Sequence, residues 1–70
     1  MIIQVTKDNT KVPVWINSDR IVKFYVYKDK ESFKPPVTII DYEAEDEIRM
    51  LTITEDPHWL QDAINAQYKL

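Results

Sequence analysis

The sequence predicts an α+β fold: a small antiparallel β-meander of about five strands, with one C-terminal α-helix packed on one face of the sheet. Ile and Val, which favour strands, number fifteen against six for Leu plus Ala, and fourteen of the fifteen precede Pro57. In this region apolar and polar residues alternate in short runs that are separated by turn residues. After Pro57 the apolar spacing becomes that of a helix. We therefore expect residues 1–70 to form a single domain.

The first two strands are expected at residues 2–6 and 11–17, joined by a tight turn at residues 7–10. Pro13 lies within the second of these strands, and a proline has no N–H to donate to a sheet. This strand is therefore predicted to lie at an edge of the sheet, or to place Pro13 where its missing donor faces solvent.

The third strand is predicted at residues 21–28, where both faces are substantially apolar. Residues 28–36 carry five charges and two consecutive prolines, so we expect a loop there. The last two strands are predicted at residues 37–42 and 48–54, as a hairpin around the acidic turn at residues 43–47.

Glycine is absent from the sequence. Phosphate-binding loops and dinucleotide fingerprints need glycine where backbone approaches a phosphate, so both kinds of site are excluded. The turns must use other residues that tolerate a left-handed backbone, and the candidates are Asn9, Asn17, Asp29 and Asp46.

The helix is predicted at residues 57–68. Asp56 can cap its first turn, and Pro57 suits the first helical position because its φ is already helical. Glu55 and Asp56 also place negative charge at the positive end of the helix dipole.

Composition narrows the class of protein further. The chain is 44% hydrophobic and 30% charged, with a net charge of -3 and no cysteine. Disulfide scaffolds and thiolate metal sites are thereby excluded. The longest apolar run is shorter than the ~20 residues that span a bilayer, and the first residues lack the pattern of a signal peptide. We expect a cytoplasmic protein that does not insert into membranes.

Five short stretches form a further pattern: Met1-Ile2 with Val5-Thr6, Asn9 at the first turn, Ile16-Asn17-Ser18-Asp19-Arg20-Ile21, Thr38-Ile39-Ile40, and Ile53-Thr54-Glu55-Asp56-Pro57. In this order they resemble the small flagellar and swarming motility proteins of the FlbD/SwrD type. The resemblance covers nearly the whole chain and implies a small bacterial accessory or regulatory protein without catalytic residues. A relative outside flagellar biology, including a phage protein, fits the same pattern. Where that family has glycine in both hairpin turns, this chain has Asn9-Thr10 and the acidic segment 43–47.

Residues for catalysis and metal binding are few. His58 is the only histidine and is expected to be a solvated residue at the start of the helix. Residues 41–47 include five acids, which we interpret as a solvated hairpin turn because the glycine and ligand spacing of calcium loops are missing. We expect no catalytic residue, no metal site and no cofactor, and thus a protein that is not an enzyme.

Four aromatic residues are the candidate partner-binding residues: Trp15, Tyr25, Tyr27 and Phe33. Aromatic side chains are enriched at the anchors of protein interfaces, and so short a chain needs more cover than its own core supplies. We therefore predict a homo-oligomer that also binds a protein partner through the sheet face bearing Trp15, Tyr25 and Tyr27. The alternative is that these residues pack beneath the 28–36 loop, with Phe33 folded over them.

A second function is left open by the charge distribution, because residues 1–35 carry a net +3 and residues 36–70 a net -6. Aromatic residues alternate in the basic half with four lysines: Lys23, Lys28, Lys30 and Lys34. Single-stranded nucleic acids or small nucleotides are bound by such mixtures of cations and aromatic rings. The pI of about 4.9 opposes this alternative, because phosphate binding depends on positive potential.

Overall fold

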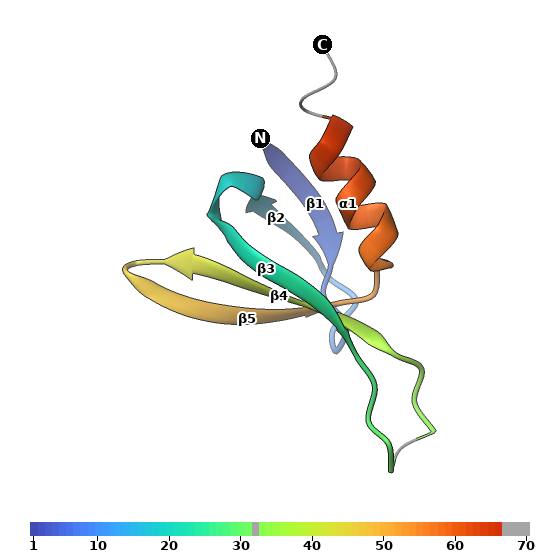
Figure 1. Ribbon diagram of the computed structural model, residues 1–70. Helices are drawn as coiled ribbons and strands as arrows, with labels where there is room; N and C mark the ends of the chain where they lie inside the picture. Colours follow the sequence, from blue (N-terminus) through green and yellow to red (C-terminus); the bar gives the residue numbers. More distant parts are fainter. Residues whose placement is uncertain (32, 67–70) are drawn as a thin grey trace.

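The computed structural model describes residues 1–31 and 33–66, and the α+β class is confirmed (Figure 1). The elements in chain order are β1 (Ile2–Thr6), β2 (Pro13–Asn17), the 3-10 turn η1 (Ser18–Arg20), β3 (Ile21–Tyr27), β4 (Val37–Ala44), β5 (Glu47–Ile53) and α1 (Pro57–Ala66). Each predicted strand is present, with ends that differ from the prediction by at most two residues. The helix begins at Pro57 as predicted, and the last two residues of its predicted range lie outside the described residues.

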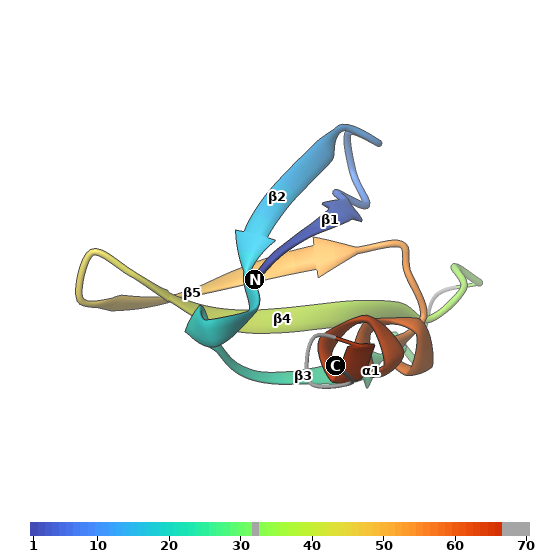
Figure 2. The ribbon, with the colours of Figure 1, turned by 90° about the horizontal axis from the view of Figure 1, so that it is seen from above.

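The five strands form two antiparallel sheets, one of β1 and β2 and one in the order β3-β4-β5. The expected meander order therefore holds within each sheet and is interrupted between β2 and β3. The interruption is η1, where the Asn17 side chain accepts a hydrogen bond from the Asp19 N–H and turns the chain. Figure 2 shows the β1–β2 hairpin standing off one side of the three-stranded sheet.

The two sheets meet at the end of β1. Lys7 and Ile53 form an isolated antiparallel bridge. On either side of it the Asp8 N–H donates to the Thr52 carbonyl at 2.9 Å, and the Thr54 N–H donates to the Thr6 carbonyl at 3.0 Å. The end of β5 is thus hydrogen-bonded to the end of β1 as a neighbouring strand would be.

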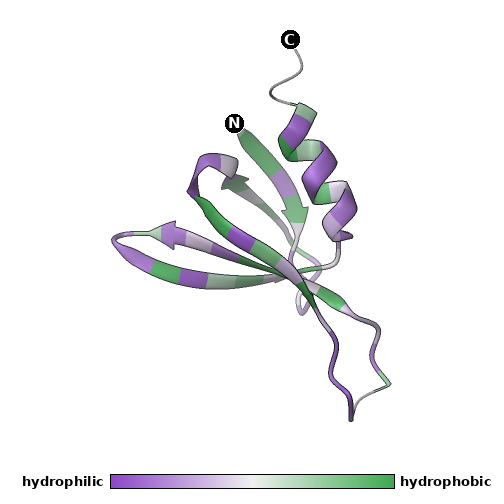
Figure 3. Ribbon diagram, viewed as in Figure 1, coloured by the Kyte–Doolittle hydropathy of each residue, from purple (hydrophilic) through white to green (hydrophobic). Residues whose placement is uncertain are grey.

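The core lies between the two sheets and is closed by α1. Its buried cluster consists of Ile3, Val5 and Ile16 from the hairpin, Ile40, Leu51 and Ile53 from the three-stranded sheet, and Leu60 from the helix. Residues of one strand that point into this cluster alternate with residues that point away from it. Figure 3 shows hydrophobic and hydrophilic residues following one another along β3 and β5. Each sheet therefore presents one face to the core.

Pro13 begins β2, which pairs with β1 alone in the described part of the chain. The predicted edge position is confirmed. The backbone nitrogen of Pro13 has no hydrogen to donate. Because Pro13 is the first residue of an edge strand, the sheet loses no hydrogen bond there.

Three non-glycine residues have a left-handed backbone in the described ranges: Lys11, Glu45 and Asp46, with φ of 58°, 53° and 64°. Of the four residues expected in this role, only Asp46 adopts it. Ala44 pairs with Glu47, so Glu45 and Asp46 form a two-residue hairpin loop with positive φ at both positions, which is the type I′ geometry that matches strand twist. Hairpin length, rather than residue preference, decides which residues take the left-handed region.

Replacing Asp46 by glycine should stabilise the protein by about 0.5–1 kcal/mol, because glycine adopts positive φ without the clash of a Cβ atom. Urea unfolding followed by circular dichroism measures the change. Thr10→Gly is the control, since Thr10 lies in the other hairpin turn without positive φ. Thr10→Gly should lower stability, and a gain of similar size from both substitutions would contradict this account of the turn.

Candidate interaction surfaces

The three-stranded sheet has a face that points away from the core, here called the outer face. Strand register places its residues in rows, such as Lys23, Asp41 and Met50, or Tyr25 and Ile39 beside Thr52. The outer face consists of Lys23, Tyr25 and Tyr27 of β3, Val37, Ile39, Asp41 and Glu43 of β4, and Ile48, Met50 and Thr52 of β5.

Ile39 lies at the centre of the outer face. Its side chain is only 8% exposed, yet it does not belong to the buried cluster between the sheets. Around it lie apolar side chains that remain open to solvent, among them Tyr27 at 52% and Met50 at 65%. The outer face therefore has a dry apolar centre and an exposed apolar surround.

A charged pair crosses the same face. The Lys23 ammonium lies 3.8 Å from Oδ2 of the buried Asp41 and 5.5 Å from the centre of the Tyr25 ring. Oδ1 of Asp41 is buried and accepts no hydrogen bond from the described residues. Among these residues Lys23 supplies the counter-charge, which offsets part of the desolvation cost of the carboxylate.

Only two of the four predicted partner-binding residues share this surface. Tyr25 and Tyr27 lie on the outer face, whereas Trp15 lies on β2 in the other sheet and is exposed there. Phe33 is fully exposed in the loop between β3 and β4, so it does not fold over the tyrosines. The expectation of one face bearing Trp15, Tyr25 and Tyr27 is corrected, because β2 and β3 belong to different sheets.

The sequence reasoning missed Ile48 and Met50, which β5 adds to the outer face. Their alternation with Glu47 and Arg49 was visible in the sequence. The pairing of β5 with β4 was needed to show that they lie beside Ile39 and Asp41.

The lysines of the nucleic-acid alternative are divided between two places. Lys23 lies on the outer face beside Asp41, and Lys28, Lys30 and Lys34 follow β3 in the connection to β4. The structure therefore does not align all four lysines along one strand.

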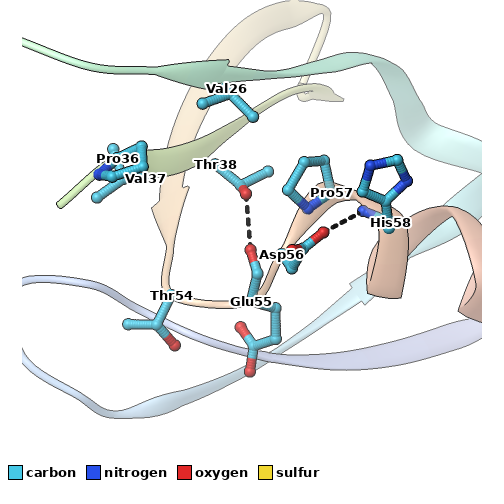
Figure 4. A pocket seen from close by; sticks show the side chains of 9 residues that line it. All are labelled: Val26, Pro36, Val37, Thr38, Thr54, Glu55, Asp56, Pro57 and His58. Atoms are coloured by element: carbon cyan, nitrogen blue, oxygen red, sulfur yellow. Dashed lines mark hydrogen bonds between the residues drawn. The ribbon is translucent and has the colours of Figure 1, made fainter.

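A pocket of about 300 Å³ lies where α1 begins (Figure 4). Asp56, which lines this pocket, caps the helix: its Oδ1 accepts a hydrogen bond from the backbone N–H of His58 at 2.6 Å. The predicted capping role of Asp56 is therefore confirmed. His58 is exposed, also as predicted. No group of three or more His, Cys, Asp or Glu side chains that could hold a metal ion is found in the described ranges.

Glu55, in the same pocket, joins three segments of the chain. Its Oε1 accepts a hydrogen bond from the Thr6 N–H and its Oε2 one from the Thr6 hydroxyl, both at 2.8 Å. Its backbone carbonyl accepts a hydrogen bond from the buried Thr38 hydroxyl at 2.6 Å. These contacts are here called the Glu55 junction.

None of the described helices is long and apolar enough to cross a membrane.

Removing the Glu55 carboxylate should destabilise the fold by about 2 kcal/mol, because two hydrogen bonds to a charged acceptor are lost and the Thr6 N–H loses its partner. Glu55→Ala is compared with Glu43→Ala, an exposed glutamate on β4, by urea unfolding. Thr6→Val tests the pairing: in a double-mutant cycle its effect should shrink when Glu55 is already alanine. Equal losses from Glu55→Ala and Glu43→Ala would contradict the junction's role.

Comparisons of the chain with protein-family models, with curated proteins and with solved structures found no match. The resemblance to flagellar and swarming motility proteins thus stays a prediction. No residue of this chain receives a role from a relative.

Proposed function

We propose that this protein is a non-enzymatic interaction module that acts through self-association and through binding of a protein partner, with the outer face as its self-association surface. The observation that carries the proposal is Ile39, a buried hydrophobic residue outside the core, with exposed apolar side chains around it. A dry apolar centre with tyrosines beside it is the composition of an interface core.

The size of the chain supports the same conclusion. A domain of this length buries only about 60% of the surface that its unfolded chain exposes, so covering one more apolar face adds substantially to stability. The outer face carries four exposed side chains with apolar surface: Tyr25, Tyr27, Ile48 and Met50. Formation of a dimer through this face would remove apolar surface of each of them from water, which stabilises the dimer.

The occupant we propose for the outer face is a second copy of the chain. Sheets pack face to face about 10 Å apart, and a two-fold axis brings the same surface from both copies together. An axis across the strands through Ile39 places Lys23 of one copy against Tyr27 of the other and keeps the two Asp41 carboxylates apart. An axis along the strands would stack these buried carboxylates on one another, at a high electrostatic cost.

The chemistry of the described residues supports a role in binding rather than catalysis. Asp56 and Glu55 are engaged by backbone and side-chain donors of the protein itself. The backbone N–H of His58 donates to Asp56 Oδ1, so this carboxylate serves as the cap of the helix.

The solution mass tests this proposal. Light scattering on a sizing column should give twice the 8.4 kDa mass of the chain, with little dependence on salt because the surface is mainly apolar. Tyr25→Ser should raise the dimer dissociation constant at least tenfold.

Trp15→Ser is the matched control, since it removes an exposed aromatic residue of the other sheet and should leave the mass unchanged. Circular dichroism verifies that both variants are folded. A mass of 8.4 kDa at all protein concentrations, or equal effects of the two substitutions, would refute the outer face as the self-association surface.

A further inference from the structure

A second surface lies between β1 and α1, which run beside each other in Figure 1. The two elements line an open groove of about 460 Å³, a volume within the range of ligand pockets. Ile2 and Gln4 contribute from the strand, and Trp59, Ala63 and Ala66 from the helix. Ile2 and Trp59 remain substantially exposed, so the groove is mainly apolar and open.

The strand side of the groove is a hydrogen-bonding edge. The Ser18 N–H donates to the Met1 carbonyl and the Lys7 N–H to the Val12 carbonyl, so the odd-numbered residues of β1 direct their backbone groups toward β2. Backbone direction alternates along a strand, and the groups of Ile2, Gln4 and Thr6 therefore point away from β2.

Thr6 demonstrates that this edge accepts a strand. Its carbonyl accepts the Thr54 N–H, and its own N–H is bonded by the Glu55 carboxylate in place of a further strand residue. The chain then turns into α1 at Pro57. Along Ile2 and Gln4, no strand of the described residues lies beside this edge.

Two of the other strand edges carry features that impede strand addition. β2 begins with Pro13, which cannot donate a hydrogen bond. β3 has a register shift between Ile21 and Lys23, and irregular strands pair poorly with a new neighbour. Ile2 and Gln4 present no proline, charge or irregularity, so the edge in the groove is open to pairing.

We propose that this groove binds an extended peptide segment of a partner protein, which adds to β1 as an antiparallel strand in the direction in which β5 already runs. The N–H and C=O groups of Ile2 and Gln4 bond its main chain, and alternate apolar side chains of the peptide pack on Trp59, Ala63 and Ala66. Since β1 is five residues long, the bound segment is about four to five residues.

The groove admits one strand, because α1 forms its other wall. A second copy of β1 would bring its own β2 along the edge that faces α1, so the occupant is a single peptide strand rather than another hairpin. This inference supplies the protein partner of the proposed function through a surface distinct from the outer face. Either can therefore fail without the other.

Selection from a phage-displayed library of random heptapeptides tests the inference, with the full chain as bait. Counter-selection uses Ala66→Trp, which fills the groove from an exposed position on α1. Asn65→Trp is the matched control, since it adds the same side chain at the neighbouring exposed residue, which does not line the groove. Enriched heptapeptides should bind Asn65→Trp like the wild type and Ala66→Trp at least tenfold more weakly.

The mode of binding is tested by the backbone. The backbone nitrogens of the peptide form two alternating sets, and only one set faces β1. Methylation of the set that faces β1 should abolish binding, and methylation of the other set should leave binding unchanged. Gln4→Pro should weaken binding at least tenfold, since it removes an N–H of the edge. Hydrogen exchange of the Gln4 amide should slow at least tenfold when the peptide is bound.

Three results would overturn the inference: no heptapeptide enriched over the Ala66→Trp counter-selection, equal binding by the two tryptophan variants, or indifference to both methylation sets. A loss of solution mass in Ala66→Trp but not in Asn65→Trp would also overturn it, by showing that a second copy fills the groove. The mass of the Tyr25→Ser variant reports separately on the outer face, so a failure there leaves the peptide result intact.

Discussion

The rest of the structure depends on the Glu55 junction, where the end of β5 reaches β1 and the chain then turns into α1. The hydrogen bond from the Thr54 N–H to the Thr6 carbonyl joins the two sheets. The Thr6 N–H donates to the Glu55 carboxylate instead of to a backbone carbonyl of a neighbouring strand. The Thr38 hydroxyl ties the same residue to β4. These bonds connect segments far apart in the sequence, at the place where the hairpin, the three-stranded sheet and the helix meet.

Two surfaces remain uncovered because of this enclosure. Each sheet turns one face toward the buried cluster, so the outer face of the three-stranded sheet lies outside that cluster, with Tyr27, Ile48 and Met50 exposed on it. Because the chain leaves the edge of β1 at Pro57, no strand within residues 1–31 and 33–66 lies beside the edge at Ile2 and Gln4. A small domain has much surface for its volume, and here that surface includes one apolar face and one open strand edge.

For the candidate surfaces, the sequence identified exposed aromatic residues correctly, but it did not predict which of them share one face. Tyr25 and Tyr27 share the outer face because residues two apart on a strand point the same way. Trp15 looked like their neighbour only while β2 and β3 were assumed to pair, and Phe33 lies in a connection whose path no periodicity describes. Met50 was not predicted as part of this face, because its position beside Asp41 depends on the register between β4 and β5.

The sequence by itself determined the α+β class, the positions of the strands to within two residues, the edge position of Pro13 and the capped helix start at Asp56 and Pro57. All of these follow from backbone chemistry and side-chain alternation within a few residues. Only the tertiary structure decided that the strands divide into two sheets, that Glu45 rather than Asn9 takes a left-handed backbone, and that Ile39 is buried outside the core. The physical reason is that strand pairing and burial depend on contacts between residues distant in sequence. Local sequence patterns do not specify which distant residues are in contact.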